Sequence, residues 1–147
     1  MNPLKTITEI KKIVNEISQK INVPKKNWEY ITFGGAIGDA TPNIEVDDNG
    51  YHYIISERGN EYERKITQDI NELLYWIFEG ITNSMASEFV LENPHPNWEQ
   101  RRTRFRKQME LLESISQKFK SKYKEEISQI LKEYPFKDGL PNTLDYE

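Results

Sequence analysis

Acidic side chains gather in one stretch of the sequence and are its first candidates for chemistry. They are Glu45, Asp47, Asp48, Glu57, Glu61 and Glu63. Two carboxylates can serve as the acid and base of a hydrolase, but such a pair needs a site that perturbs a pKa. The segments around these residues predict short strands joined by tight turns, which form an open sheet without a deep cleft. We therefore interpret the acids as an exposed face that can also bind a partner, and a small hydrolase is the least favoured hypothesis.

Other motifs that could hold a ligand are incomplete. Residues 34–38 are rich in glycine but lack the Lys-Ser/Thr pair and the following helix of a phosphate loop. The acids before Gly50 have the spacing of a calcium loop, but Ser56 stands where that loop needs a bidentate glutamate. His52 and His95 each lack a nearby second ligand or nucleophile, and the chain has no cysteine. We predict no catalytic residue, no metal site, no cofactor and no small-molecule substrate.

The charge of the chain is unevenly distributed. The net charge is -4, with 16 acidic and 9 basic residues in 1–99 but 8 acidic and 11 basic residues in 100–147. A protein with two signs of charge suits a protein partner better than nucleic acid, whose binders carry a stronger basic excess. The basic side chains of residues 101–124 are spread around predicted helices and form no single stripe. We interpret them as a solvated helical surface, and a nucleic-acid-associated regulatory protein that uses this segment is the alternative hypothesis.

The elements that must position these residues follow from the periodicity of the sequence. Apolar residues recur every three or four positions from Leu4 to Ile21, which predicts a helix, and Thr6 with Glu9 has the spacing of a capping box. Aromatic and β-branched segments follow, separated by turns rich in asparagine and glycine. They predict strands over residues 28–33, 43–46, 51–58 and 61–66. Successive hairpins indicate an antiparallel meander of three or four strands with one wet face.

From Thr67, a plausible N-cap, the period becomes helical again. The apolar positions predict three helices, from about Thr67 to Met85, from Trp98 to Leu112 and from Phe119 to Tyr134. Separated strands and helices indicate an α+β fold whose three C-terminal helices pack on one face of the sheet. We expect a single domain over residues 1–136, followed by a polar, frayed tail over residues 137–147.

Three sequence blocks in the middle of the chain carry a family likeness. They are YHYIISERGNE at 51–61, DINELLYWIFEGIT at 69–82 and MASE at 85–88, with weaker matches from Arg101-Arg102 to Pro135-Phe136. Over about residues 44–136 the chain resembles the bacterial immunity protein 63 family. The resemblance implies a small cytoplasmic protein that is not an enzyme and that binds and neutralises the effector domain of a polymorphic toxin.

The hairpins are the surface that we expect to bind this toxin domain. Many such toxins attack nucleic acid through basic clefts, so an acidic surface can mimic phosphate and speed association, with tyrosines as anchors beside it. The predicted partner-binding residues are Glu45, Asp47, Asp48, Tyr51, Tyr53, Glu57, Glu61, Tyr62 and Glu63. We favour a monomer. We expect no membrane segment, because no apolar run approaches the roughly 20 residues that a membrane helix needs.

Overall fold

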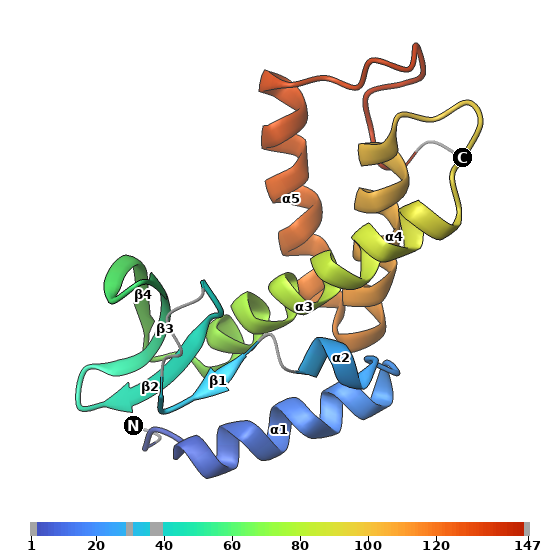
Figure 1. Cartoon of the computed structure of the whole chain (residues 1–147). Coiled ribbons are helices and arrows are strands. Elements are labelled where there is room, and N and C mark those ends of the chain that lie inside the picture. Colours follow the sequence, from blue (N-terminus) through green and yellow to red (C-terminus); the bar gives the residue numbers. More distant parts are fainter. Residues whose placement is uncertain (1–2, 29–30, 36–39, 146–147) are drawn as a thin grey trace. The chain divides into compact units, whose positions relative to one another are not determined.

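The elements follow one another as helix, sheet and helices, the order that the sequence predicts. The structure is a computed structural model that describes residues 3–28, 31–35 and 40–145. The elements are α1 (Ile7–Lys20), α2 (Lys25–Trp28), β1 (Thr32–Phe33), β2 (Asn43–Asp47), β3 (Gly50–Glu57), β4 (Asn60–Thr67), α3 (Ile70–Glu92), α4 (Gln100–Ile115) and α5 (Gln117–Glu133) (Figure 1). The contacts divide the chain into one unit over Met1–Ile81 and another over Thr82–Glu147. The predicted α+β class is confirmed.

Helix α1 begins at the predicted capping box. The Thr6 hydroxyl accepts a hydrogen bond from the backbone N–H of Glu9 at 3.2 Å, and the Glu9 carboxylate accepts one from the N–H of Thr6 at 3.0 Å. These two bonds satisfy donors that the start of a helix leaves free. Ile10 and Val14 are buried on the apolar stripe of the helix, which therefore packs into the first unit.

The four strands form one sheet in the order β1-β2-β3-β4. β2 with β3 and β3 with β4 are antiparallel, as predicted for the two hairpins. β1 differs from the prediction, because it pairs with β2 in parallel, with Thr32 opposite Asn43. The predicted first strand is also shorter than expected: Lys25–Trp28 is a short helix, only Thr32–Phe33 is strand, and residues 29 and 30 lie outside the described residues.

Helices α1 and α3 cover one face of this sheet (Figure 1). Tyr51 and Tyr53 alternate onto that face of β3. The Tyr51 hydroxyl accepts a hydrogen bond from the backbone N–H of Lys5 at 2.7 Å, just before α1. The Tyr53 ring meets the Trp76 ring of α3 edge to face, with 6.3 Å between the centroids. The sheet face that carries Tyr51 and Tyr53 is therefore the core of the first unit.

The turn between β2 and β3 depends on a glycine. Gly50 has a φ of 132°, and a Cβ added to it would lie 2.5 Å from the backbone oxygen of Thr67. We expect Gly50→Ala to lower the free energy of unfolding by about 2–4 kcal/mol, from backbone strain and overpacking together. Gly35→Ala is the control, because no atom of the described residues lies within 4 Å of its added Cβ. Chemical denaturation that shows equal stability for the two variants would contradict this role of Gly50.

In the second unit, the C-terminal half of α3 packs with α4 and α5. A buried chain of side chains links the three helices: the Tyr123 hydroxyl donates to Oε1 of Gln108 at 2.7 Å, and Nε2 of Gln108 donates to Oγ1 of Thr82 at 3.3 Å. Ser116 separates α4 from α5 and caps α5, with its hydroxyl accepting from the N–H groups of Lys118 and Phe119. The break predicted between a helix ending near Leu112 and one beginning near Phe119 is confirmed.

The segment after α5 is held by a buried arginine. Arg102 of α4 has no exposed surface. Its guanidinium donates to both carboxylate oxygens of Asp138, at 2.7 and 2.9 Å, and to the backbone oxygens of Pro141 and Thr143. It also stacks over the Phe136 ring, 4.0 Å from the centroid. The expectation of a frayed tail was wrong for the described part of this segment, because the cation of Arg102 gathers its acceptors around itself.

Candidate functional site

The sheet face opposite Tyr51 and Tyr53 carries a chain of charged and polar side chains. Oδ1 of Asp47 lies 2.8 Å from Nε2 of His52, and Nδ1 of His52 lies 2.7 Å from Nη1 of Arg64. Arg64 also donates through Nε and Nη2 to the two carboxylate oxygens of Glu61, at 3.0 and 2.6 Å. We call Asp47, His52, Arg64 and Glu61 the His52 network. It connects β2, β3 and β4 on one surface.

A β-bulge brings Glu61 into this network. Side chains three residues apart in a regular strand point to opposite faces. The β3–β4 register shifts between Ile55 and Ser56, so that Ile55 pairs with Glu63 and Ser56 pairs with Glu61. β4 therefore has one extra residue, Tyr62, at this point. The extra residue reverses the alternation, and Glu61 shares a face with Arg64.

The hydrogen bonds fix the form of the His52 ring. A guanidinium group only donates hydrogen bonds, so Nδ1 of His52 must accept from Arg64. Nε2 then carries the proton and donates a hydrogen bond to Oδ1 of Asp47. The side chain of His52 is 5% exposed and that of Asp47 is 53% exposed. The neutral imidazole is thus a buried link that orients an exposed carboxylate.

The acids of the network are held in their charged form. The hydrogen bond from His52 lowers the pKa of Asp47 below its ordinary value, and the N–H of Asn49 adds to this effect. The hydrogen bonds from Arg64 lower the pKa of Glu61 in the same way. Hydrogen bonds to a carboxylate favour its ionised state. The surface therefore presents fixed negative charges at neutral pH.

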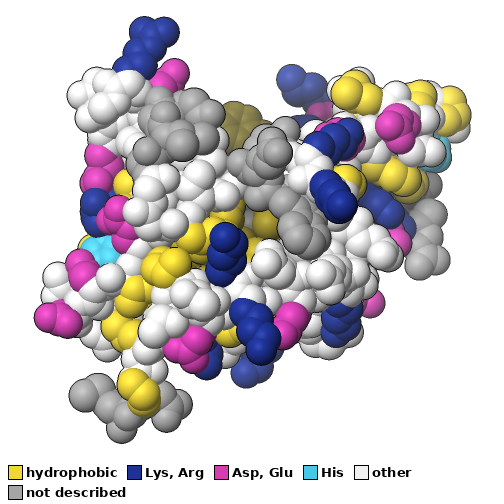
Figure 2. Space-filling view, turned by 60° about the horizontal axis from the view of Figure 1, so that its bottom comes forward, with side chains coloured by type: hydrophobic (Ala, Val, Ile, Leu, Met, Phe, Trp, Pro, Cys, Tyr) yellow, Lys and Arg dark blue, Asp and Glu magenta, His cyan; other side chains and the backbone are white. Residues whose placement is uncertain are grey.

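The structure brings together only part of the predicted binding residues. Glu45 stands opposite His52 on β2 and adds charge near Arg64. Tyr62 is 68% exposed. Asp48 is exposed in the turn before β3, and Glu57 is exposed at the last residue of β3. Figure 2 shows acidic side chains spread along the side of the view where the sheet lies.

Three predicted residues lie elsewhere. Glu63 pairs with Ile55 and belongs to the opposite sheet face. Tyr51 and Tyr53 are 2% and 7% exposed. Burial is also the main reason why the pKa of Tyr53 is raised to about 12, with Glu79 and Glu63 adding to it. The two tyrosines are core residues that a partner cannot reach, so we leave them out of the proposed binding surface.

His52 and Arg64 are the members that the sequence analysis did not assign to the surface. Their position in the strands offered a signal. Register places His52 opposite Ile66 and Ile54 opposite Arg64, so the even-numbered residues of β3 and β4 share one face. The bulge that adds Glu61 has no such signal in the sequence.

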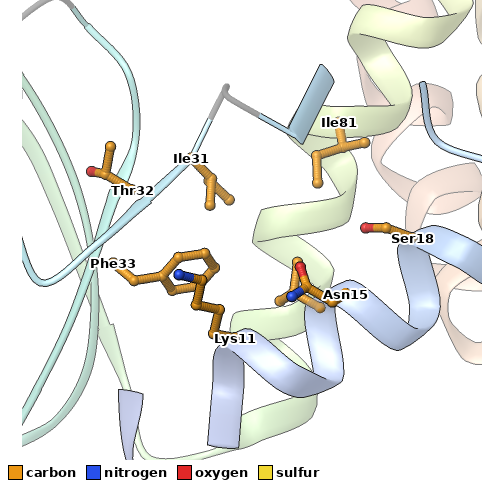
Figure 3. Close-up of a pocket in the computed structure, with 8 residues that line it drawn as sticks. Lys11, Asn15, Ser18, Ile31, Thr32, Phe33 and Ile81 are labelled. Atoms are coloured by element: carbon orange, nitrogen blue, oxygen red, sulfur yellow. The ribbon is translucent and has the colours of Figure 1, made fainter. Parts of the chain in front are cut away.

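The first unit also contains a pocket of about 500 Å³ between α1, β1 and α3 (Figure 3). Val14, Ile31, Phe33 and Ile81 form its apolar wall, and Lys11 is the one titratable group among its lining residues. A lysine without a nearby base or acid in the lining offers no acid–base pair. Among the described residues, no group of three His, Cys, Asp or Glu side chains is arranged to hold a metal ion.

The arginines of α4 are used within the second unit. Arg101 donates to the backbone oxygens of Tyr134 and Pro135, and Arg106 donates to that of Leu144. Arg102 is buried on Asp138. Phosphate binding needs accessible cations. The alternative hypothesis that the basic segment 101–124 binds nucleic acid would therefore depend on its lysines, of which Lys118 and Lys122 are exposed.

Comparison with known proteins gives one finding. A family model described as Immunity protein 63 matches residues 47–129, which is more than half of the chain. No curated protein and no solved structure matches the chain. The matched region begins at Asp47 and includes the whole His52 network. In the described part of the chain, no helix is both long and apolar enough to cross a membrane.

Proposed function

Since the chain belongs to the immunity protein 63 family, we propose that it neutralises a cognate bacterial toxin by binding the toxin's effector domain directly. Binding either occludes the active site of the toxin or locks the toxin in an inactive conformation. The protein catalyses no reaction in this process, and it acts in the cytoplasm of the cell that it protects. The partner is the toxin domain encoded beside it.

The observation that supports this proposal is the His52 network. Asp47 and Glu61 are exposed by 53% and 45%, yet each is held in place by a donor that is itself bonded on its other side. Charged side chains that are already ordered lose less entropy when a partner binds. A carboxylate row with this fixed geometry suits a partner with a basic surface, because complementary charge raises the association rate.

The proposed contact surface is accordingly smaller than the sequence suggests. It comprises the half-buried Glu45 and five exposed residues of the two hairpins: Asp47, Asp48, Glu57, Glu61 and Tyr62. Tyr62 is the exposed aromatic anchor of this set, since tyrosine is enriched among residues that dominate binding energy.

The test uses the toxin domain of the neighbouring gene. We expect the purified protein to form a complex with this domain and to suppress its activity in proportion to the fraction bound. Isothermal calorimetry measures the complex, and a toxin assay with increasing amounts of the protein measures the suppression. Absence of a complex, or suppression by far fewer molecules than the toxin present, would contradict neutralisation by binding, the second result because it requires turnover.

A further inference from the structure

Strand β4 forms one edge of the sheet (Figure 1). Within the described residues, β3 is the strand that pairs with it. Its eight residues are mostly exposed, including the large apolar side chains of Tyr62 and Ile66 at 68% and 48%. An edge strand presents a row of unpaired N–H and C=O groups that can pair with another chain.

The hairpin register shows which backbone groups of β4 are free. Asp47 and Gly50 close a two-residue turn, so the even-numbered residues of β3 direct their backbone groups to β2. The backbone oxygen of Ser56, which accepts from the N–H of Ala40, fits this alternation. The backbone N–H and C=O groups of the odd-numbered residues of β3 therefore form the hydrogen bonds with β4. Arg64 and Ile66 pair with even-numbered residues of β3, and their own N–H and C=O groups point to the free edge.

The side chains along this edge are complementary to themselves. Residues 62–66 read Tyr-Glu-Arg-Lys-Ile, with Arg64 at the centre. An antiparallel copy centred on the same residue places Tyr62 opposite Ile66 and Glu63 opposite Lys65, each twice by symmetry. Apolar and opposite-charge pairs across two strands stabilise their pairing. The two central arginines would repel, but Glu61 already neutralises each of them through two hydrogen bonds.

We propose that β4 pairs with β4 of a second copy of this chain in a symmetric dimer, with the twofold axis at Arg64. The two sheets then continue into each other, and Tyr62 and Ile66 become covered on one face. A twofold interface requires a self-complementary surface, which the order of residues 62–66 supplies. Tyr62 belongs to both this edge and the proposed toxin surface, so pairing of β4 and toxin contact at Tyr62 exclude each other, whereas Asp47 and Asp48 lie away from the edge and stay accessible in the dimer.

Charge variants test the pairing. Glu63→Lys places lysines at both positions of each Glu63–Lys65 pair, and Lys65→Glu places glutamates there. We expect each variant alone to self-associate about tenfold more weakly than the unmodified protein. Mixing the two variants restores opposite charges at both pairs, so the mixture should recover the mass of a dimer. Sedimentation velocity over a concentration series measures the mass in each case.

Proline variants test the backbone contact separately. Ile66→Pro removes an N–H that points to the free edge while leaving the β3–β4 ladder intact, and proline is tolerated at such positions. Ile66→Ala is the matched control, because it shortens the side chain but keeps the N–H. We expect the proline variant to remain monomeric and the alanine variant to retain a weakened dimer. Circular dichroism confirms folding, and Glu63→Lys still decides the question if the proline variant does not fold.

Three results would overturn the dimer. The unmodified protein could keep the mass of one chain at all concentrations, which would indicate that the charged side chains of β4 prevent this edge strand from pairing with another chain. Glu63→Lys could dimerise as strongly as the unmodified protein. Ile66→Pro could keep the mass of a dimer, which would show that the backbone groups of this edge do not form the interface. Failure of the dimer with toxin binding intact leaves the proposed function standing.

Discussion

Replacing Arg102 with alanine is expected to lower the free energy of unfolding by about 3–5 kcal/mol. The guanidinium has no exposed surface and supplies donors to Asp138, Pro141 and Thr143. Alanine removes these donors together and leaves the carboxylate of Asp138, which is 5% exposed, without its cation. Removing one partner of a buried ion pair lowers the free energy of unfolding by more than the intact pair contributes to it, because the other charge stays buried without a partner. Chemical denaturation followed by circular dichroism measures the loss.

Two controls identify the cause of this loss. Arg102→Lys keeps the charge but cannot form the same fork of hydrogen bonds, so it should recover only part of the stability. Arg104→Ala removes an arginine from the same helix that donates to Asn83 on an exposed surface, and it should change stability little. Equal losses for Arg102→Ala and Arg104→Ala would contradict the role of the buried ion pair.

The pH dependence of stability tests the ion pair between Arg102 and Asp138 independently. The hydrogen bonds from Arg102 hold the pKa of Asp138 well below its ordinary value of 3.8. A carboxyl group whose folded pKa is depressed stabilises the protein fully above its unfolded pKa and loses that contribution as pH falls. The difference in stability between the unmodified protein and Asp138→Asn should therefore be constant near neutral pH and shrink below about pH 4. A difference that does not change with pH would contradict the ionised pair.

Reversing three charges of the hairpins at once is expected to weaken toxin binding by about 100-fold. The variant Asp47→Lys, Asp48→Lys, Glu57→Lys turns an attractive surface into a repulsive one for a basic partner. Most of the loss of affinity should appear as a lower association rate constant. The loss should be smaller in high salt, because exposed charges are screened. Surface plasmon resonance against the toxin domain at two salt concentrations measures both effects.

A matched variant separates this surface from overall charge. Glu110→Lys, Glu125→Lys, Glu133→Lys changes the net charge equally but lies on exposed positions of α4 and α5 in the second unit. We expect it to bind the toxin with nearly unchanged affinity. Equal loss in the two variants would indicate a nonspecific charge effect, and unchanged binding in the hairpin variant would refute the hairpin surface while leaving toxin binding elsewhere possible.

Much of the fold could be predicted because local signals and packing agree. The capping box of Thr6 and Glu9, the turns around Gly50 and Gly59, and the change to helical period after Thr67 each correspond to a boundary in the structure. The start of α3 shows the limit of such signals. The hydroxyl of Thr67 accepts from the N–H of Asp69, and the Asp69 carboxylate accepts from the N–H of Asn71, so Asp69 rather than Thr67 stands next to the first helical residue.

The remaining features depend on contacts between distant residues. The parallel pairing of β1 relies on the bond from the N–H of Thr32 to the oxygen of Pro42, and a two-residue strand has too little pattern to reveal it. The hold of Arg102 on Asp138 joins residues 36 apart, so a basic run and a polar tail looked unrelated. Tyr51 and Tyr53 alternate correctly in the sequence, but alternation alone does not say which face of the sheet the helices cover.

The single-residue joint at Ser116 limits how the length of this protein can vary. The buried side chains of α5, at Phe119, Tyr123, Ile127 and Leu131, recur every four residues along one line of the helix. One added or deleted residue at the joint would turn that line by about 100° away from α4. Insertions and deletions should therefore be selected against at this joint and tolerated at the hairpin turns. The joint can then serve as the reference position for aligning relatives of very different sequence.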